Sequence, residues 1–170
     1  MKIDFACGER KKEGFIGVDQ LPHPDVDIVW DLNNYPYPFE DESVDEIYCS
    51  QFIEHVDDLV KFMGELYRVM KHGATGIIIA PYWSHINTWR DPTHKRGIAD
   101  TTLYFFDKDW RDSNRLGCYN IDTNFSVGWS LKMDEYYIPE YNSLDDKDKV
   151  HAMTHYINVF AEVTFNIVKK

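Results

Sequence analysis

Short apolar segments recur along the first half of the chain, and most of them end at a glycine or an acidic residue. The segments that predict strands are residues 1–6, 15–19, 26–31, 44–49 and 75–80. The last of these is apolar almost throughout, without alternation, which is typical of a strand buried on both faces. Several such strands together with one clear helix predict an α/β fold with a mostly parallel sheet.

An amphipathic helix is predicted between the fourth and fifth of these strands, over residues 57–71. Its apolar side chains follow helical spacing at Leu59, Phe62, Met63, Leu66, Tyr67 and Met70. Asp57 and Asp58 stand at the predicted start, where acidic side chains favour the helix dipole. Gly73 follows the predicted end and suits a helix C-cap.

The second half of the chain has a weaker pattern. Residues 125–137 and 158–168 alternate between apolar and polar side chains, which predicts two further strands. Residues 101–110 predict a short strand or helix, and residues 142–149 predict a charged loop. No repeat, low-complexity tract or linker interrupts the chain, so we expect residues 1–170 to form a single domain.

The charge and the cysteine content argue against several classes of function. The chain has 18 Lys and Arg against 29 Asp and Glu, a net charge of −11, and such a surface repels phosphate backbones. Nucleic acid is therefore disfavoured as a partner. Cys7, Cys49 and Cys118 have no CxxC spacing, so we expect reduced thiols and no metal site. Since the sequence shows no leader pattern and no apolar run of ~20 residues, we expect a cytoplasmic protein with no membrane segment.

Chemically distinctive residues stand where the predicted strands end. Gly8 follows the first strand, Asp19 ends the second, Asp31 ends the third, and Ser50 and Gln51 follow the fourth. Ligands of open α/β sheets bind beyond the carboxyl ends of the strands. A glycine lets a ligand approach the backbone, one acid can accept both hydroxyls of a ribose, and the next can accept from an adenine amino group. The ordered set predicts a site for an adenosine-like ligand.

Several segments, taken in order, match a known pattern. They are residues 3–8, 14–19, 26–32, 36–47, 54–55 and 65–73, followed by the strand that ends at Pro81. With this order and spacing, the first half of the chain resembles the class I S-adenosylmethionine (SAM)-dependent methyltransferases, especially the methyltransferase type 11 branch. The resemblance implies a Rossmann-like, mostly parallel sheet with an antiparallel C-terminal strand. It also implies SAM as the cofactor, with a cofactor-binding half over residues 1–81 and an acceptor-side half over residues 82–170.

The resemblance further implies which residues bind the cofactor. They are Asp4, Ala6, Cys7, Gly8, Asp19, Asp31, Leu32, Ser50, Gln51 and His55. The first motif would form the floor under the methionine part of SAM, Asp19 would hold the ribose hydroxyls, and Asp31 would accept from adenine. From the residues alone, Asp19 could also be a turn cap and His55 an ordinary helix residue. Asp4 lies inside a strand, where an unpaired carboxylate is costly, so we expect it to be hydrogen-bonded or functional.

The sequence departs from the family pattern after the first motif. Where the family has a second and a third glycine, this chain has charged residues over positions 9–13 before Gly14. Only about eight residues separate the first two predicted strands, fewer than the ~10–12 that a crossover helix needs. We therefore expect the first helix to be missing or reduced to a turn, and the SAM site to be relatively open.

Residues 85–94 follow the fifth predicted strand and so lie on the ligand side of the sheet. His85, Asp91 and His94 could supply a general base that takes a proton from the acceptor, since histidine has a suitable intrinsic pKa. One alternative is a loop cap held by hydrogen bonds. Another is a metal site, for which this spacing on a loop is a weak signal. The aromatic side chains of the second half could line an acceptor pocket or only cover a sheet face.

The sequence thus predicts an enzyme that transfers a methyl group from SAM to a small-molecule acceptor. The main alternative is a SAM- or adenosine-binding module without catalytic activity, either regulatory or dependent on a partner. A dinucleotide-binding Rossmann enzyme is disfavoured because no GxGxxG follows the first strand. The sequence does not fix the oligomeric state. A homodimer is one possibility, because a small open sheet with exposed aromatics could associate with a second copy.

Overall fold

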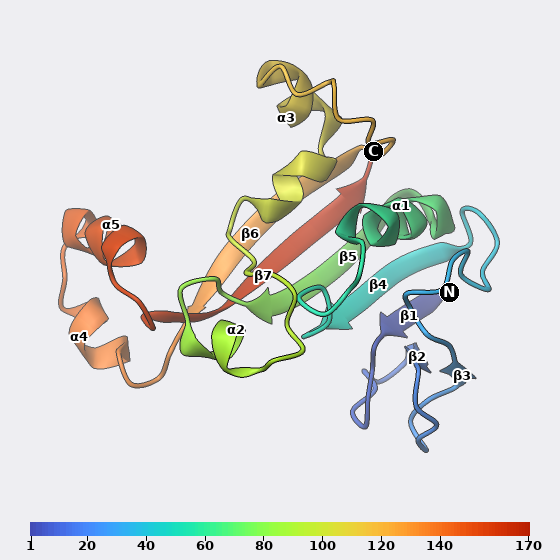
Figure 1. Ribbon diagram of the computed structural model, residues 1–170, viewed down its shortest axis with the longest axis horizontal. Coiled ribbons are helices and arrows are strands. Elements are labelled where there is room, and N and C mark those ends of the chain that lie inside the picture. The colour runs from blue at the N-terminus through green and yellow to red at the C-terminus, as the bar shows by residue number, and fades with distance from the viewer.

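The computed structural model describes residues 1–170 and contains one seven-stranded sheet (Figure 1). Its strands are β1 (Lys2–Phe5), β2 (Ile16–Asp19), β3 (Ile28–Val29), β4 (Val44–Ser50), β5 (Met70–Pro81), β6 (Phe125–Met133) and β7 (Phe160–Lys169). They are ordered β3-β2-β1-β4-β5-β7-β6. Strands β1 to β5 pair in parallel, whereas β7 pairs antiparallel with both β5 and β6. The predicted fold class, a mostly parallel Rossmann-like sheet with an antiparallel C-terminal strand, is confirmed.

The first helix of the pattern is missing, as the short connection predicted. The helices present are α1 (Leu59–Val69), α2 (Ile86–Arg90), the 3-10 helix η1 (Thr102–Phe106), α3 (Lys108–Ser113), α4 (Ile138–Asn142) and α5 (Asp146–His155). Residues 6–15 form a loop that is fastened to the strands on either side of it. The N–H of Lys12 donates to the carboxylate of Asp4 at 2.7 Å, and the N–H of Gly8 donates to that of Asp19 at 3.0 Å. The β1–β3 end of the sheet therefore carries loops and no helix (Figure 1).

Helix α1 forms where the hydrophobic spacing predicted it, but its end differs from the prediction. It begins after Asp58, whose side chain accepts hydrogen bonds from two backbone N–H groups at 3.0 Å. The prediction that Gly73 caps its end is wrong, because the chain enters β5 directly at Met70. Met70 is fully buried and pairs with Val44, so its burial in the sheet ends the helix earlier. Gly73 instead adopts a φ of +78° inside β5.

The predicted charged loop at residues 142–149 is wrong over its second half. Helix α5 begins at Asp146, and the side chain of Asp145 accepts a hydrogen bond from the N–H of Asp148 at 2.8 Å. Acidic side chains stabilise helix N-termini, so the charges that indicated a loop start a helix instead. Helices α4 and α5 lie between β6 and β7 in the chain and extend beyond the end of these strands (Figure 1).

One hydrophobic cluster joins the two halves of the chain. It contains buried residues from Ile3 in β1 to Ile167 in β7. The buried face of α1 contributes Phe62, Met63, Leu66 and Val69 to this cluster. Val44, Ile47 and Ile78 line the middle of the sheet beneath them. None of the helices combines the length and the hydrophobicity that a membrane crossing requires.

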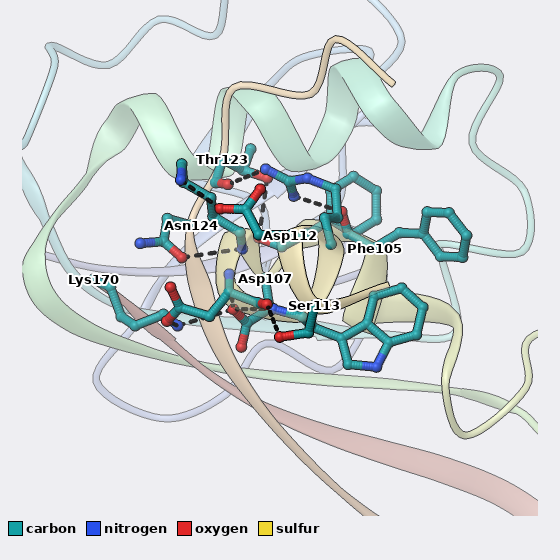
Figure 2. A network of polar contacts seen from close by, with 12 residues as sticks. Phe105, Asp107, Asp112, Ser113, Thr123, Asn124 and Lys170 are labelled. Carbon is teal, nitrogen blue, oxygen red and sulfur yellow. Dashed lines mark hydrogen bonds and ion pairs between the residues drawn. The ribbon is translucent and has the colours of Figure 1, made fainter. Parts of the chain in front are cut away.

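A polar network holds the connection between η1 and β6 (Figure 2). At its centre is Arg111, which is only 4% exposed. Its guanidinium donates to the carbonyl oxygens of Phe105, Ile121 and Thr123 at 2.6, 2.9 and 2.9 Å. Lys170 also pairs with the carboxylate of Asp107 at 2.9 Å. These contacts fix residues 107–124 against the end of the sheet where β7 finishes, which is opposite the carboxyl ends of β4 and β5 (Figure 1).

Candidate functional site

A cavity of about 700 Å³ opens at the carboxyl ends of the parallel strands. Its volume lies within the range of about 300–1,000 Å³ typical of small-molecule sites. The residues that line it are Ala6, Asp19, Gln20, Asp31, Leu32, Asn33, Gln51, Phe52, His55, Pro92, Thr93 and Lys95. We call it the first cavity. The position follows from the topology, because ligands of open α/β sheets bind beyond the carboxyl edge.

Six of the ten residues predicted to bind the cofactor line this cavity. They are Ala6, Asp19, Asp31, Leu32, Gln51 and His55. Asp4, Cys7, Gly8 and Ser50 lie within two residues of Ala6 or Gln51 in sequence but do not line the cavity. The six other lining residues were not predicted to bind the cofactor, although the sequence placed Pro92 and Thr93 on the ligand side of the sheet; the six come from the loops after β2, β3 and β4 and from the segment after α2. No hydrophobic or charge pattern marks these loop positions, so only the folded chain brings them together.

Two of the five non-glycine residues with positive φ values line this cavity. Ala6 follows β1 directly and Gln51 follows β4 directly, and both adopt positive φ values, 57° and 56°. Residues other than glycine seldom occupy this region, and such conformations tend to cluster at ligand sites. At these two strand ends the chain turns sharply, so the backbone itself forms part of the cavity wall.

Asp19 sits at the end of β2 with both carboxylate oxygens engaged by the backbone. One oxygen accepts from the N–H of Gly8 at 3.0 Å and the other from the N–H of Leu21 at 3.1 Å. Each carboxylate oxygen still has a second lone pair available to a ligand. Asp19 therefore does cap the turn, as one reading of the sequence allowed. The same hydrogen bonds fix the orientation of its side chain, which also lines the cavity.

Asp4 and Cys7 lie beneath the loop that follows β1. Asp4 is 2% exposed and accepts the N–H of Lys12, so the expected hydrogen bond is present. Burial raises the pKa of Asp4, while the hydrogen bond from Lys12 lowers it. Burial, with the charges of Asp4 and Asp19, raises the pKa of the Cys7 thiol to about 11. These two side chains support the loop that shapes the cavity.

The wall on the β3 side is formed by Asp31 and its neighbours. Asp31 accepts a hydrogen bond from the N–H of Asn33 at 2.9 Å. Asn33 in turn accepts from the N–H of Asp57 at 2.8 Å, which links this loop to the segment before α1. Leu32 is buried and offers an apolar surface beside Asp31. The pair combines an acceptor with an apolar contact, as an adenine ring would require.

A second cavity of about 360 Å³ adjoins the first and shares Gln51 and His55 with it. The residues that line it are Gln51, Glu54, His55, Pro81, Asn87, Arg90, Asp91, His94, Ala161 and Glu162. Asp91 and His94 were predicted as catalytic, and both lie here. The aromatic residues predicted as a possible acceptor pocket line neither cavity, and Tyr82 and Phe106 belong to the core.

Glu54 is the most unusual residue of the second cavity. It is 1% exposed, yet neither carboxylate oxygen has a hydrogen-bond partner. Burial raises its pKa to about 7. Burial also lowers the pKa of the neighbouring His55, and the charge of His94 lowers it further. The sequence flagged Glu54 only as part of a motif, because burial of a carboxylate cannot be read from the residue type.

His85 has a different setting from the other two predicted catalytic residues. It is buried, and its Nδ1 accepts the N–H of Asn87 at 3.1 Å as the N-cap of α2. Its Nε2 lies 3.1 Å from the carboxylate of Asp134 and donates to it, because Nδ1 is the acceptor. The pKa of Asp134 is lowered by the N–H of Tyr136 and by His85. His85 lines neither cavity, and its contacts are those of a loop cap.

A third, mostly apolar cavity of about 530 Å³ lies among α4, α5 and the segment that leads into β7. The residues that line it are Tyr137, Glu140, Tyr141, Leu144, Ala152, His155, Tyr156, Ile157 and Val159. It shares no residue with the first two cavities. Of the residues that the sequence predicted at the strand ends, Asp19, Asp31 and Gln51 line the first cavity, and Gln51 also lines the second.

Comparison with known proteins agrees with this geometry. Residues 16–78 match the methyltransferase domain family of type 11. A SAM-dependent methyltransferase from Archaeoglobus fulgidus shares the fold with a TM-score of 0.67 and 21% identity, over 99% of this chain and 85% of that chain. No curated protein sequence matches the chain.

Two further solved structures share the fold at lower identity. The complex between a methyltransferase activator of Haloferax volcanii and a methyltransferase aligns with a TM-score of 0.57 and 16% identity, over 99% of this chain and 81% of that chain. A phosphoethanolamine N-methyltransferase from Haemonchus contortus, in complex with SAM, aligns with a TM-score of 0.52 and 14% identity, over 99% of this chain and 48% of that chain.

The family match over residues 16–78 and the sheet order support the predicted resemblance to the class I SAM-dependent methyltransferases of the type 11 branch. S-adenosyl-L-methionine is the cofactor of this class of enzyme. The first cavity fits that cofactor in chemistry, since it combines strained strand ends, one acid at the end of β2, and an acid beside an apolar residue after β3.

Proposed function

We propose that this methyltransferase binds SAM in the first cavity and transfers its methyl group to a small-molecule acceptor that enters through the second cavity. The observation that carries the proposal is the shared wall: Gln51 and His55 line both cavities. A cofactor on one side and an acceptor on the other would then meet at these two side chains. Residues 1–81 supply most of the first cavity, whereas residues 82–170 supply Asn87, Arg90, Asp91 and His94 to the second.

SAM supplies an activated methyl group when it is bound, so the protein chiefly has to hold and align the reactants. Asp19 accepts the ribose hydroxyls, Asp31 accepts from the adenine amino group, and Leu32 packs against the ring. Ala6 forms the floor at the end of β1, where the positive φ brings the backbone close to the ligand. Asp4, Cys7, Gly8 and Ser50 do not contact the cofactor. They support the loop after β1 and the end of β4, which carry the residues that line the cavity.

An acceptor that loses a proton needs a group to receive it. Asp91 and His94 are the proposed candidates because they line the second cavity. The Nδ1 of His94 lies 2.8 Å from the carbonyl oxygen of Thr88, so it carries the hydrogen and leaves Nε2 with a free lone pair. His85 is proposed to position the segment rather than to touch the acceptor, since both its ring nitrogens are engaged by the protein.

The small-molecule class follows from the charge and from the size of the second cavity. A net charge of −11 repels nucleic acid, and about 360 Å³ accommodates a small metabolite. Arg90 in the same cavity offers a cation to an acidic group on such an acceptor. A cytoplasmic location is proposed because all three cysteines are free thiols.

A SAM-binding module that needs a partner is the second candidate. The missing first helix leaves the cofactor cavity open, and one structural relative is a complex with a methyltransferase activator. Such a module would bind SAM but would not turn it over alone. A homodimer also remains a prediction, which light scattering of the purified chain measures directly.

The test has two stages. Calorimetric titration with SAM, S-adenosylhomocysteine and NAD measures which ligand binds, and we expect the first two to bind and NAD to fail. The chain is then incubated with SAM and a panel of small amines and alcohols, including phosphoethanolamine, and S-adenosylhomocysteine release is measured. Turnover with any acceptor supports the enzyme, whereas SAM binding without turnover favours the partner-dependent module. Binding of NAD in place of SAM would refute both.

A further inference from the structure

Glu54, His55 and His94 bring three potential metal ligands together beside the cofactor cavity. One ligand atom from each side chain lies within 4.8 Å of the other two. Glu54 is 1% exposed and its two oxygens have no hydrogen-bond donor. Burying a carboxylate without a partner is costly, and buried charges are normally paired or bound to a metal. The cluster therefore has an unmet requirement for a positively charged partner.

Each histidine of the cluster has its Nδ1 engaged by the protein and its Nε2 without a hydrogen-bond partner. His94 donates from Nδ1 to the carbonyl of Thr88 at 2.8 Å, which leaves Nε2 with a lone pair. Thr93 donates its hydroxyl to Asp91 at 2.7 Å and therefore accepts from Nδ1 of His55 at 3.0 Å. Nε2 of His55 is left with a lone pair as well. Fixing one ring nitrogen by a carbonyl or a carboxylate-linked group is the usual support of a metal-bound histidine.

Backbone contacts hold the two segments of the cluster in place. The N–H of Lys95 donates to the carbonyl oxygen of Glu54 at 2.8 Å. The guanidinium of Arg96 donates to the carbonyl oxygens of Ile53 and Val56 at 3.0 and 2.5 Å. The loop after β4 and the segment after α2 are thus joined next to the three ligands. Such support gives a site the fixed geometry that metal binding needs.

We propose that Glu54, His55 and His94 form a binding site for a divalent transition metal ion, with Zn²⁺ as the best match. Two imidazoles and one carboxylate are a known zinc ligand set that leaves a further position open. Mg²⁺ and Ca²⁺ prefer all-oxygen sites, so they fit this set poorly. Of the acids of the second cavity, Glu162 pairs with Lys132 at 3.0 Å, whereas Glu54 and Asp91 share the cavity with one cation, Arg90, which also favours a metal ion.

This proposal differs from the sequence expectation of no metal, and also from the metal alternative considered for His85, Asp91 and His94. The sequence compared residues within one loop, whereas the structure joins two residues after β4 to one residue after α2. His85 is excluded because it lines neither cavity. Asp91 contributes through Thr93, although its carboxylate also lies 3.7 Å from Nε2 of His94.

The position suggests a role that rests on the proposed function. His55 lines both cavities, so an ion held there would stand in the wall between cofactor and acceptor. An acceptor oxygen or nitrogen could fill the open coordination position, where a metal ion eases the loss of its proton. His94 would then act as a ligand instead of as a base.

The test is a calorimetric titration of the purified, chelator-treated full chain with ZnCl₂, in the absence of SAM and acceptor. We expect one Zn²⁺ per chain, weakened at least ~100-fold in Glu54→Gln and in His94→Ala, because loss of outer-shell partners alone costs about 10–100-fold. Thr93→Val should weaken binding by about 10-fold. Glu162→Gln is the matched control, a carboxylate of the same cavity outside the ligand set, and should bind normally.

A surface histidine pair requires a control of its own. His151 and His155 are one helical turn apart on α5 with ring centroids 4.0 Å apart, and such a pair can hold a metal ion. The double variant His151→Ala, His155→Ala should retain the site. If the double variant loses Zn²⁺ binding while Glu54→Gln keeps it, or if the wild-type chain binds no Zn²⁺, the proposal is overturned.

Thermal unfolding separates metal binding from a structural role of Glu54. Zn²⁺ should raise the Tm of the wild-type chain, because a ligand of the folded state stabilises it. Glu54→Gln replaces a buried carboxyl group that has no hydrogen-bond partner by an amide of nearly the same shape, so its metal-free Tm should stay close to that of the wild type, with no response to Zn²⁺. A Zn²⁺-induced rise equal in both proteins would contradict the assignment. None of these measurements uses SAM, so failure of the proposed function would leave them unaffected.

Discussion

The sharpest test of the cofactor assignment is the replacement of Asp19 by asparagine. Asp19 ends β2, lines the first cavity, and accepts the N–H groups of Gly8 and Leu21 at 3.0 and 3.1 Å. Asparagine is nearly isosteric but keeps only one acceptor oxygen and carries no charge. It would place an amide donor opposite one of these backbone donors and would lose at least one of the two ribose contacts.

The magnitude follows from those contacts. A hydrogen bond to a charged group contributes about 1.5–3 kcal/mol, and two such bonds to the ribose would be weakened or lost. A loss of about 3 kcal/mol corresponds to roughly 100-fold weaker binding. We therefore expect the Kd for SAM and that for S-adenosylhomocysteine to rise by about this factor, since both carry the same ribose.

Calorimetry of both ligands with wild type, Asp19→Asn and Asp25→Asn measures the effect. Asp25 lies in the next connection and outside the lining of the cavity, so its variant loses the same charge without losing the contact. Urea unfolding of each variant shows whether the loop after β1 is still held. Affinity of Asp19→Asn within about threefold of wild type in a folded protein would refute the ribose assignment, and an equal loss in Asp25→Asn would indicate a general charge effect.

Three further predictions concern the scaffold. Arg111→Met should lower the free energy of unfolding by about 3 kcal/mol in urea, because three backbone carbonyl oxygens lose their buried donor; a change below about 1 kcal/mol would contradict the network in Figure 2. Gly17→Ala should cost about 1–3 kcal/mol in the same assay, since an added Cβ would lie 2.5 Å from the carbonyl oxygen of Asp25, and a neutral result would mean that this loop yields freely. With a thiol reagent at pH 8, Cys118 should react quickly because it is exposed, whereas Cys7, with its pKa raised to about 11, and the fully buried Cys49 should react only after unfolding. Rapid labelling of a second thiol in the native protein would argue against the packing of β1 and β4.

The metal prediction and the cofactor prediction can be tested at residues that belong to only one of the two sites. Asp19 is at the end of β2, whereas Glu54 follows β4, and the two share no hydrogen bond. Variants at one site should therefore leave binding at the other largely unchanged in a two-ligand titration. Strong coupling between SAM and Zn²⁺ would instead indicate that His55 transmits binding across the shared wall of the two cavities.

The sequence determined the parts of the protein that depend on local pattern. The apolar run of β5 and the alternation of β6 and β7 predicted strands, because burial imposes a period on the residues of each element. The length of the connection after β1 excluded a helix there, since a crossover helix needs more residues. The strand ends predicted Asp19 and Asp31 at one edge, because the carboxyl ends of parallel strands meet on the same side of the sheet.

The tertiary structure decided what depends on burial and on contacts between distant segments. The end of α1 was set by Met70 entering the sheet beside Val44, a pairing that a local cap signal at Gly73 does not contain. The burial of Glu54 without a partner arises only in the folded chain, and its closeness to His94 accompanies the bonds from Lys95 and Arg96 that join two segments far apart in the chain. The sequence specifies the chemical type of each side chain, but its burial and its hydrogen-bond partners are determined only when the chain folds.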